Sequence, residues 1–147
     1  MLQYPDISPE IIRIGPVAVR WYGLMYLLGF GASYLLVKYQ IGKKMLSLPE
    51  DFAESLYSYL MLGLLIGARL GYVIFYNPAY YLYKPLEIFA LWHGGMSFHG
   101  GLIGSILAGF IFCKKTSALF WQTADIVIVT APIGLGLGRL GNFINAE

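Results

Sequence analysis

Charge and cysteine are both scarce in this chain of 147 residues. Charged side chains make up 12% of the sequence and hydrophobic side chains 58%, and the mean hydropathy is +0.65. A water-soluble domain carries about 25% charged residues, so the composition argues strongly against a soluble globular fold. The single cysteine, Cys113, rules out an internal disulfide and any zinc or redox site built from a cysteine pair.

Basic residues are few as well, and they form no continuous patch. Ten Lys and Arg residues stand against eight Asp and Glu residues, for a net charge of +2. Proteins that bind nucleic acid concentrate Lys and Arg where phosphates make contact, so we predict no nucleic-acid partner. The two histidines, His93 and His99, have no other ligand at a metal-binding spacing, so we expect no metal site.

The parts of the chain that lack charged residues form long apolar stretches. Four of them, at roughly 20 residues each, cover more than half of the chain, and this is the length of a helix that crosses a bilayer. We therefore predict an all-α fold, a polytopic helical membrane protein with about four transmembrane helices in a single domain over residues 1–147. A short hairpin is expected around Gly15-Pro16. The predicted spans are residues 21–41, 52–76, 95–113 and 119–137.

Lysines gather in two of the predicted loops and indicate the orientation. Loops that stay in the cytoplasm carry an excess of Lys and Arg close to the helix ends. The clustered residues follow the first and the third span; they are Lys38, Lys43, Lys44, Lys114 and Lys115. We therefore expect the N-terminus, the loop at 77–94 and the C-terminal stretch on the outer face.

Glycine accompanies polar residues in three segments, at 67–71, 93–101 and 134–147. The spacing of Gly63, Gly67 and Gly71 favours close helix packing over a ligand site. His99 lies near the outer end of the third span, where an ionisable residue is a functional candidate. An interfacial histidine bonded to headgroups or to a carbonyl is the alternative. Ser97 is a weaker candidate as a nucleophile for His99, because residues two apart on a helix point to different sides.

Three charges fall inside or at the boundary of the spans, and an unpaired charge in a membrane costs several kcal/mol by order of magnitude. Asp125 is the expected partner of Arg69 as a structural ion pair, and a catalytic role is the alternative. Arg139 differs because the carboxamides of Asn142 and Asn145 follow it at i+3 and i+6. A guanidinium fork beside two carboxamides suits a phosphate or ester headgroup.

Two motifs give the sequence a family resemblance. His99-Gly-Gly-Leu-Ile-Gly104 and Gly138-Arg-Leu-Gly-Asn-Phe-Ile-Asn-Ala-Glu147 resemble the bacterial phosphatidylglycerol:prolipoprotein diacylglyceryl transferases. Members of that family are about twice as long and have seven spans, so we expect this chain to be the N-terminal half of a longer protein. Shorter matches occur along the chain, at 15–17, 21–23, 67–72 and 94–98.

The resemblance implies a transferase of the bacterial inner (plasma) membrane with its N-terminus outside, in the periplasm. The family moves the diacylglyceryl group of phosphatidylglycerol onto the lipobox cysteine thiol of preprolipoproteins, the first step of lipoprotein maturation. The implied partners are phosphatidylglycerol, the signal peptide that carries the lipobox cysteine, and membrane lipid, with no cofactor.

The same resemblance implies the site residues. His99 and Arg139 are expected to be catalytic, and Glu147 is expected to support Arg139. Whether His99 or an arginine activates the thiol stays open. Substrate-binding roles are implied for Arg139, Asn142, Asn145, Tyr22 and Arg69.

The alternative class is a non-enzymatic transporter or channel half, in which the embedded charges line a pathway. It predicts an inverted repeat between the two halves of the sequence, and none is visible. A purely structural membrane subunit would need no cluster of His, Arg and Asn at one face.

Overall fold

The computed structural model describes residues 8, 10–14, 17–43, 48–49, 51–90 and 94–144, and most of them are helical. The all-α prediction is confirmed, and the expected hairpin is present as an antiparallel pair of short strands. The elements in chain order are β1 (Glu10–Ile14), β2 (Val17–Arg20), α1 (Trp21–Lys43), α2 (Phe52–Phe75), α3 (Pro78–Tyr83), the 3₁₀-helix η1 (Pro85–Phe89), α4 (Phe98–Thr116), α5 (Phe120–Ile128) and α6 (Ala131–Ile144).

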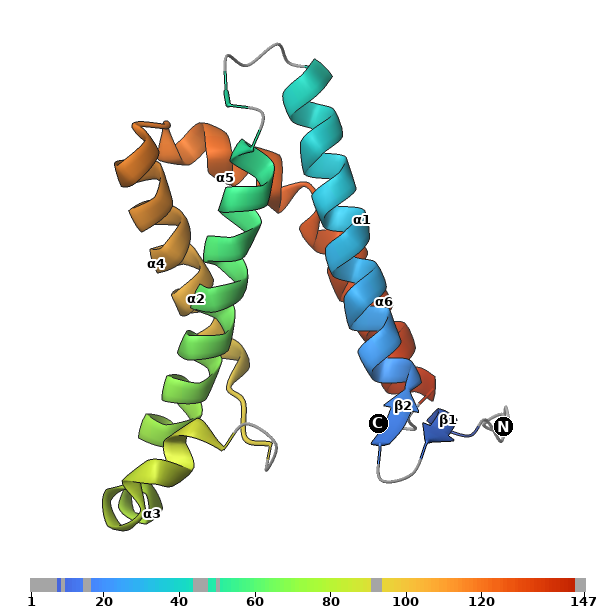
Figure 1. Ribbon diagram of the computed structural model, residues 1–147, viewed down its shortest axis with the longest axis vertical. Coiled ribbons are helices and arrows are strands. Elements are labelled where there is room, and N and C mark those ends of the chain that lie inside the picture. The colour runs from blue at the N-terminus through green and yellow to red at the C-terminus, as the bar shows by residue number, and fades with distance from the viewer. Residues whose placement is uncertain are drawn as a thin grey trace, which may run out of the picture. The chain divides into compact units, whose positions relative to one another are not determined.

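The chain divides into two compact units, residues 1–48 with 125–147, and residues 49–124. The first holds the hairpin, α1 and α6, and the second holds α2, α3, η1 and α4 (Figure 1). The expected single domain over residues 1–147 stays a prediction.

Two stretches of the described residues are long and apolar enough to cross a membrane. One is α2, Phe52–Phe75, and the other is Phe120–Ile144, which joins α5 and α6. The count of four spans therefore stays a prediction.

Two helix boundaries differ from the predicted ones. Helix α4 begins at Phe98 instead of residue 95, because Gly94 and Gly95 adopt positive φ angles of 76° and 80° and Ser97 is extended. The predicted fourth span is broken after Ile128 and continues to Ile144. Pro132, in the first turn of α6, has no N–H with which to continue the hydrogen-bond ladder of α5.

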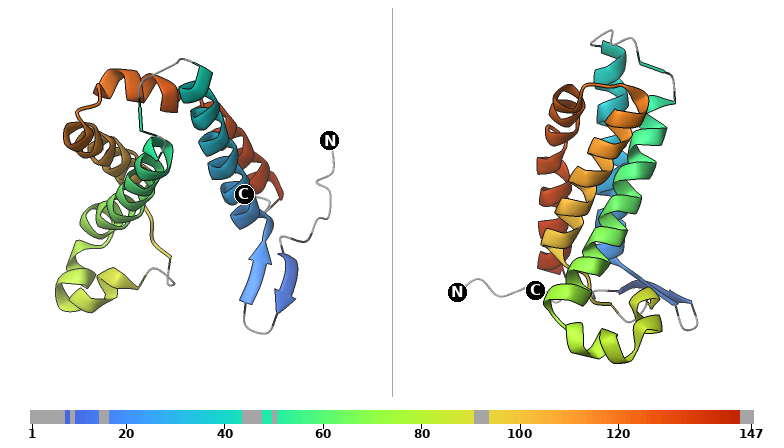
Figure 2. Two further views of the ribbon diagram at one scale, coloured as in Figure 1. Left: turned by 45° about the horizontal axis from the view of Figure 1, so that its top comes forward. Right: turned by 90° about the vertical axis from the view of Figure 1, so that its left-hand side faces the viewer.

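Helices α1 and α6 pack side by side (Figure 2). The hydroxyls of Ser33 and Thr130 are 2.6 Å apart, and the Gln40 side chain donates to the carbonyl of Ile126 at 3.1 Å. Interhelical hydrogen bonds of this kind satisfy polar groups that hydrocarbon would leave unpaired. They tie the turn between α5 and α6 to α1.

Helices α2 and α4 cross with their backbones almost in contact. A Cβ placed on Gly67 would lie 2.7 Å from the Cα of Gly104, nearer than carbon atoms approach one another. Small residues on both helices permit this approach, and dispersion between the two backbones then stabilises the pair. The packing role predicted for the glycines of α2 is confirmed.

Replacing Gly104 by alanine should destabilise the full-length protein by about 1–3 kcal/mol, because overpacking forces the two backbones apart. The new Cβ would meet the Gly67 Cα at 2.8 Å. Gly109 on the same helix is the matched control, since its nearest neighbour, Leu60 Cδ2, would lie at an ordinary 3.5 Å. Thermal unfolding in detergent should show a lower midpoint for Gly104→Ala only. Equal midpoints for the two variants would contradict the crossing.

Candidate active site

The site residues expected from the sequence are distributed over both units. One unit holds Tyr22 on α1 with Arg139 and Asn142 on α6, and the other holds Arg69 on α2 and His99 on α4. Asn145 and Glu147 lie outside the described residues. The structure thus brings Tyr22 to the Arg139–Asn142 turn, and Arg69 to the residues that precede His99.

Tyr22 packs against α6 at Gly141. A Cβ on the buried Gly141 would lie 3.0 Å from Cδ2 of Tyr22, so this contact requires a residue without a side chain. The Tyr22 hydroxyl is hydrogen-bonded to the Tyr26 hydroxyl at 2.9 Å. Sequence reasoning did not single out Gly141 or Tyr26, although Gly141 lies within the Arg139–Glu147 motif.

Arg139 and Asn142 belong to α6 itself and not to a stretch that follows the last span. Three residues apart on a helix, they lie on the same face. Arg139 is exposed and Asn142 is half-buried. A guanidinium and a carboxamide are therefore presented together near the end of an apolar helix, and Tyr22 contacts the same turn of that helix at Gly141.

His99 lies in the first turn of α4 with an exposed side chain. Its ring meets the ring of Phe98 edge to face, with 5.7 Å between centroids. The imidazole is therefore open to solvent at the end of a helix.

Ser97 is the N-cap of α4 and is 4% exposed. Its Oγ accepts a hydrogen bond from the Gly100 N–H at 3.2 Å, and its own N–H donates to the carbonyl of Ala68 at 2.8 Å. The Ser97 hydroxyl therefore caps a helix, and no hydrogen bond joins it to His99 in the described residues. The Ser97–His99 nucleophile pair that the sequence left open is not formed.

Arg69 is 5% exposed, and its guanidinium is enclosed by backbone carbonyls. Nε donates to Ile88 at 2.8 Å, Nη1 to Gly94 and Gly95, and Nη2 to Glu87 at 2.6 Å and Ala90 at 3.1 Å. The guanidinium carbon also lies 5.3 Å from the centre of the Tyr81 ring. An arginine has five N–H donors, and all of them are used here.

The ion pair of Arg69 with Asp125 that the sequence suggested is therefore wrong, because carbonyl oxygens take every donor of the guanidinium. No donor is left for a substrate in this arrangement. Sequence reasoning could not identify these partners, because every residue carries a backbone carbonyl. Within the described parts of the chain, no three His, Cys, Asp or Glu side chains gather to hold a metal ion.

Two apolar stretches long enough to span a bilayer, one carrying Arg69 and the other Arg139 and Asn142, define a helical membrane protein with polar residues in its spans. Comparison with known families makes the class specific. The family described as prolipoprotein diacylglyceryl transferase matches residues 9–147, and the chain belongs to this family of membrane transferases.

Relatives support this assignment over nearly the whole chain. Three proteins named phosphatidylglycerol–prolipoprotein diacylglyceryl transferase, from Desulfotalea psychrophila, Geobacter sulfurreducens and Bordetella parapertussis, are 54%, 51% and 53% identical to it over 97%, 99% and 100% of its length. The chain covers 53%, 56% and 56% of those proteins, about half of their length. The family expected from the motifs is confirmed, and nothing supports the transporter or channel alternative.

Proposed function

We propose that the full-length protein transfers the diacylglyceryl group of phosphatidylglycerol to the lipobox cysteine of preprolipoproteins. The cysteine sulfur bonds to the glyceryl carbon that carries the phosphate, the carbon–oxygen bond to that phosphate breaks, and glycerol phosphate leaves. The thiol proton goes to a base. One observation on this chain carries the proposal: the exposed Arg139 shares a helix face with Asn142 near the end of α6.

The proposed reaction assigns Arg139 the role of binding the phosphate. Negative charge grows on the phosphate oxygens as the carbon–oxygen bond breaks, and an arginine already in place to bind two of them lowers the barrier. In this proposal Asn142 and Asn145 orient the headgroup, Glu147 supports Arg139, and Tyr22 contacts lipid oxygens.

His99 is proposed as the base. A free thiol has a pKa of about 8.5 and is mostly protonated at neutral pH, so the substrate sulfur needs help to become a nucleophile. The exposed ring of His99 at the start of α4 is placed to accept that proton.

We also propose that the protein lies in the inner membrane with its N-terminus and its site on the periplasmic side. In each unit the candidate residues and the clustered lysines that follow the first and third spans occupy opposite helix ends. Lys43 ends α1, about 32 Å of helix from Tyr22, and Lys115 lies in the last turn of α4, about 24 Å from His99. Lysine-rich ends are retained in the cytoplasm.

A single lipobox peptide serves in two assays, the first for the reaction and the second for the orientation. The full-length protein in detergent, given phosphatidylglycerol and a water-soluble peptide that contains a lipobox cysteine, should yield a diacylglyceryl thioether by mass spectrometry. Absence of this product, or its formation without phosphatidylglycerol, would contradict the proposed reaction.

The same peptide, added outside sealed membrane vesicles, reports on orientation. Right-side-out vesicles should modify the peptide, and inverted vesicles should do so only after detergent opens them. Product from intact inverted vesicles alone would place the site on the cytoplasmic side.

A further inference from the structure

We infer that Arg69 is a positioning residue that holds residues 87–90 and 94–95 against α2 and thereby sets the place of His99 at the start of α4. The inference rests on the proposed function only for the role of His99. It replaces the substrate-binding role expected of Arg69.

The segment ahead of α4 has carbonyl groups that regular structure does not pair. η1 ends at Phe89, and the described residues from Gly94 to Ser97 belong to no helix or strand. A carbonyl removed from water without a donor costs several kcal/mol by order of magnitude in an apolar setting. Arg69 supplies five donors to five carbonyls from one buried side chain, and one of these, the Glu87 carbonyl, also accepts the Ala90 N–H.

The charge of Arg69 is accommodated by the same contacts. Five carbonyl dipoles point their negative ends at the guanidinium, and the Tyr81 ring lies 5.3 Å away. The face of an aromatic ring attracts a cation, more strongly when water is excluded. Arg69 and the segment therefore satisfy each other: the carbonyls need donors, and the buried cation needs acceptors.

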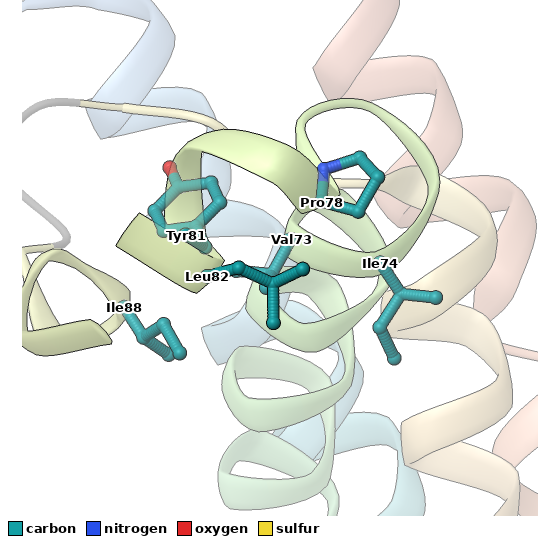
Figure 3. Close-up of a pocket in the computed structure, with 6 residues that line it drawn as sticks. All are labelled: Val73, Ile74, Pro78, Tyr81, Leu82 and Ile88. Carbon is teal, nitrogen blue, oxygen red and sulfur yellow. The ribbon is translucent and has the colours of Figure 1, made fainter. Parts of the chain in front are cut away.

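A surface hollow of about 230 Å³ lies between the end of α2, α3 and η1, and Figure 3 shows apolar side chains around it, among them Tyr81 and Ile88. The same two residues hold Arg69 by other groups, the Ile88 carbonyl and the Tyr81 ring face.

Hydrogen bonds and neighbouring residues connect Arg69 continuously to the first turn of α4, where His99 lies. The Gly95 carbonyl accepts from Nη1 of Arg69 at 3.0 Å. Two residues later the Ser97 N–H is bonded to the carbonyl of Ala68, the neighbour of Arg69 on α2. Ser97 caps α4, and His99 follows in its first turn. Loss of the Arg69 contacts therefore frees the segment immediately before His99.

Lysine cannot replace Arg69 in this role. Its ammonium group is a compact charge with three donors, whereas the carbonyls of Glu87, Ile88 and Gly95 lie around a planar fork with five. A residue that only neutralised a lipid phosphate by its charge would tolerate the change.

Hydrogen–deuterium exchange in the full-length protein tests the positioning role without an activity assay. The variants are Arg69→Gln and Arg69→Lys, and the matched control is Lys84→Gln, an exposed cation beside the ring of Tyr80 in the same region. We expect amide exchange across residues 87–100 to be at least about tenfold faster in both Arg69 variants, because bonds to a charged donor are lost. The control should match the wild type.

Unchanged exchange in Arg69→Lys would overturn the inference, and this variant decides the matter if Arg69→Gln does not fold. Fast exchange without any phosphatidylglycerol-dependent transfer by the wild type would support the positioning role and contradict the proposed function. The two failures are therefore distinguishable.

Transfer kinetics supply the second readout. Arg69→Lys should lower kcat about tenfold or more with little change in the KM for phosphatidylglycerol, and most of this effect should vanish in a His99→Gln background. Effects of residues that act through one another are not additive. Additive effects, or a change mainly in KM, would show that Arg69 contacts the lipid and would overturn the inference.

Discussion

Replacing Arg139 by lysine in the full-length protein should lower diacylglyceryl transfer by at least about 10²-fold while protein levels stay near those of the wild type. Lysine keeps the unit charge but loses the planar fork that binds two phosphate oxygens at once. Removing one well-placed donor from a site that stabilises a developing anion costs roughly 10²-fold to 10³-fold in rate, or about 3–4 kcal/mol. Arg139 is exposed, so we expect the lysine variant to fold normally, and the rates are compared per folded molecule.

A different result is expected if Arg139 only extends to the lipid headgroups from the end of α6. Lysine and arginine both reach the interface, so transfer would then remain near normal. Lys84→Arg is the control for a lysine–arginine exchange at an exposed position away from the proposed site, and it should leave the rate unchanged. Near-normal transfer by Arg139→Lys would remove this residue from the active site.

Replacing His99 by glutamine should lower transfer by about 10²-fold to 10⁴-fold near neutral pH, the usual contribution of a general base. The deficit should shrink as the pH rises toward about 9, because the substrate thiol then loses its proton without a base. The measurement is the ratio of wild-type to variant rate at several pH values between about 7 and 9 with saturating phosphatidylglycerol. Glutamine retains hydrogen-bonding capacity, and the exposed position of His99 should tolerate it.

A constant ratio at every pH would assign His99 a binding or structural role. Activation of the thiol would then fall to the positive field of an arginine, the possibility that the sequence left open. The two outcomes are separated by the slope of the ratio against pH and not by the size of the loss.

Hydropathy predicts the position of a helix well where the helix forms because of its own apolar residues. The first two spans, predicted at 21–41 and 52–76, are helices at Trp21–Lys43 and Phe52–Phe75. Burial of apolar side chains in lipid depends on the stretch itself and on little else. The later boundaries depend on backbone geometry, namely the positive φ angles of Gly94 and Gly95 and the turn before Pro132, and were less well predicted.

Residue type and motif identified the candidate site residues. They did not identify the neighbours that these residues contact in the folded chain. Arg139, Asn142 and His99 stand in segments whose composition is unusual for an apolar helix. The glycines on α2 predicted close packing, yet the matching Gly100 and Gly104 on α4 became evident only from the crossing. A small residue carries no information about which helix it will meet.

The sequence by itself determined the membrane class, the all-α fold and the family, because hydrophobic length and motif are properties of a contiguous segment. Only the tertiary structure decided what Arg69 does. From the sequence this residue was a charge in need of a counterion, and in the folded chain five carbonyl oxygens satisfy it. The physical reason is that these acceptors belong to the backbone, which is the same at every residue, so only their arrangement in space identifies them as partners.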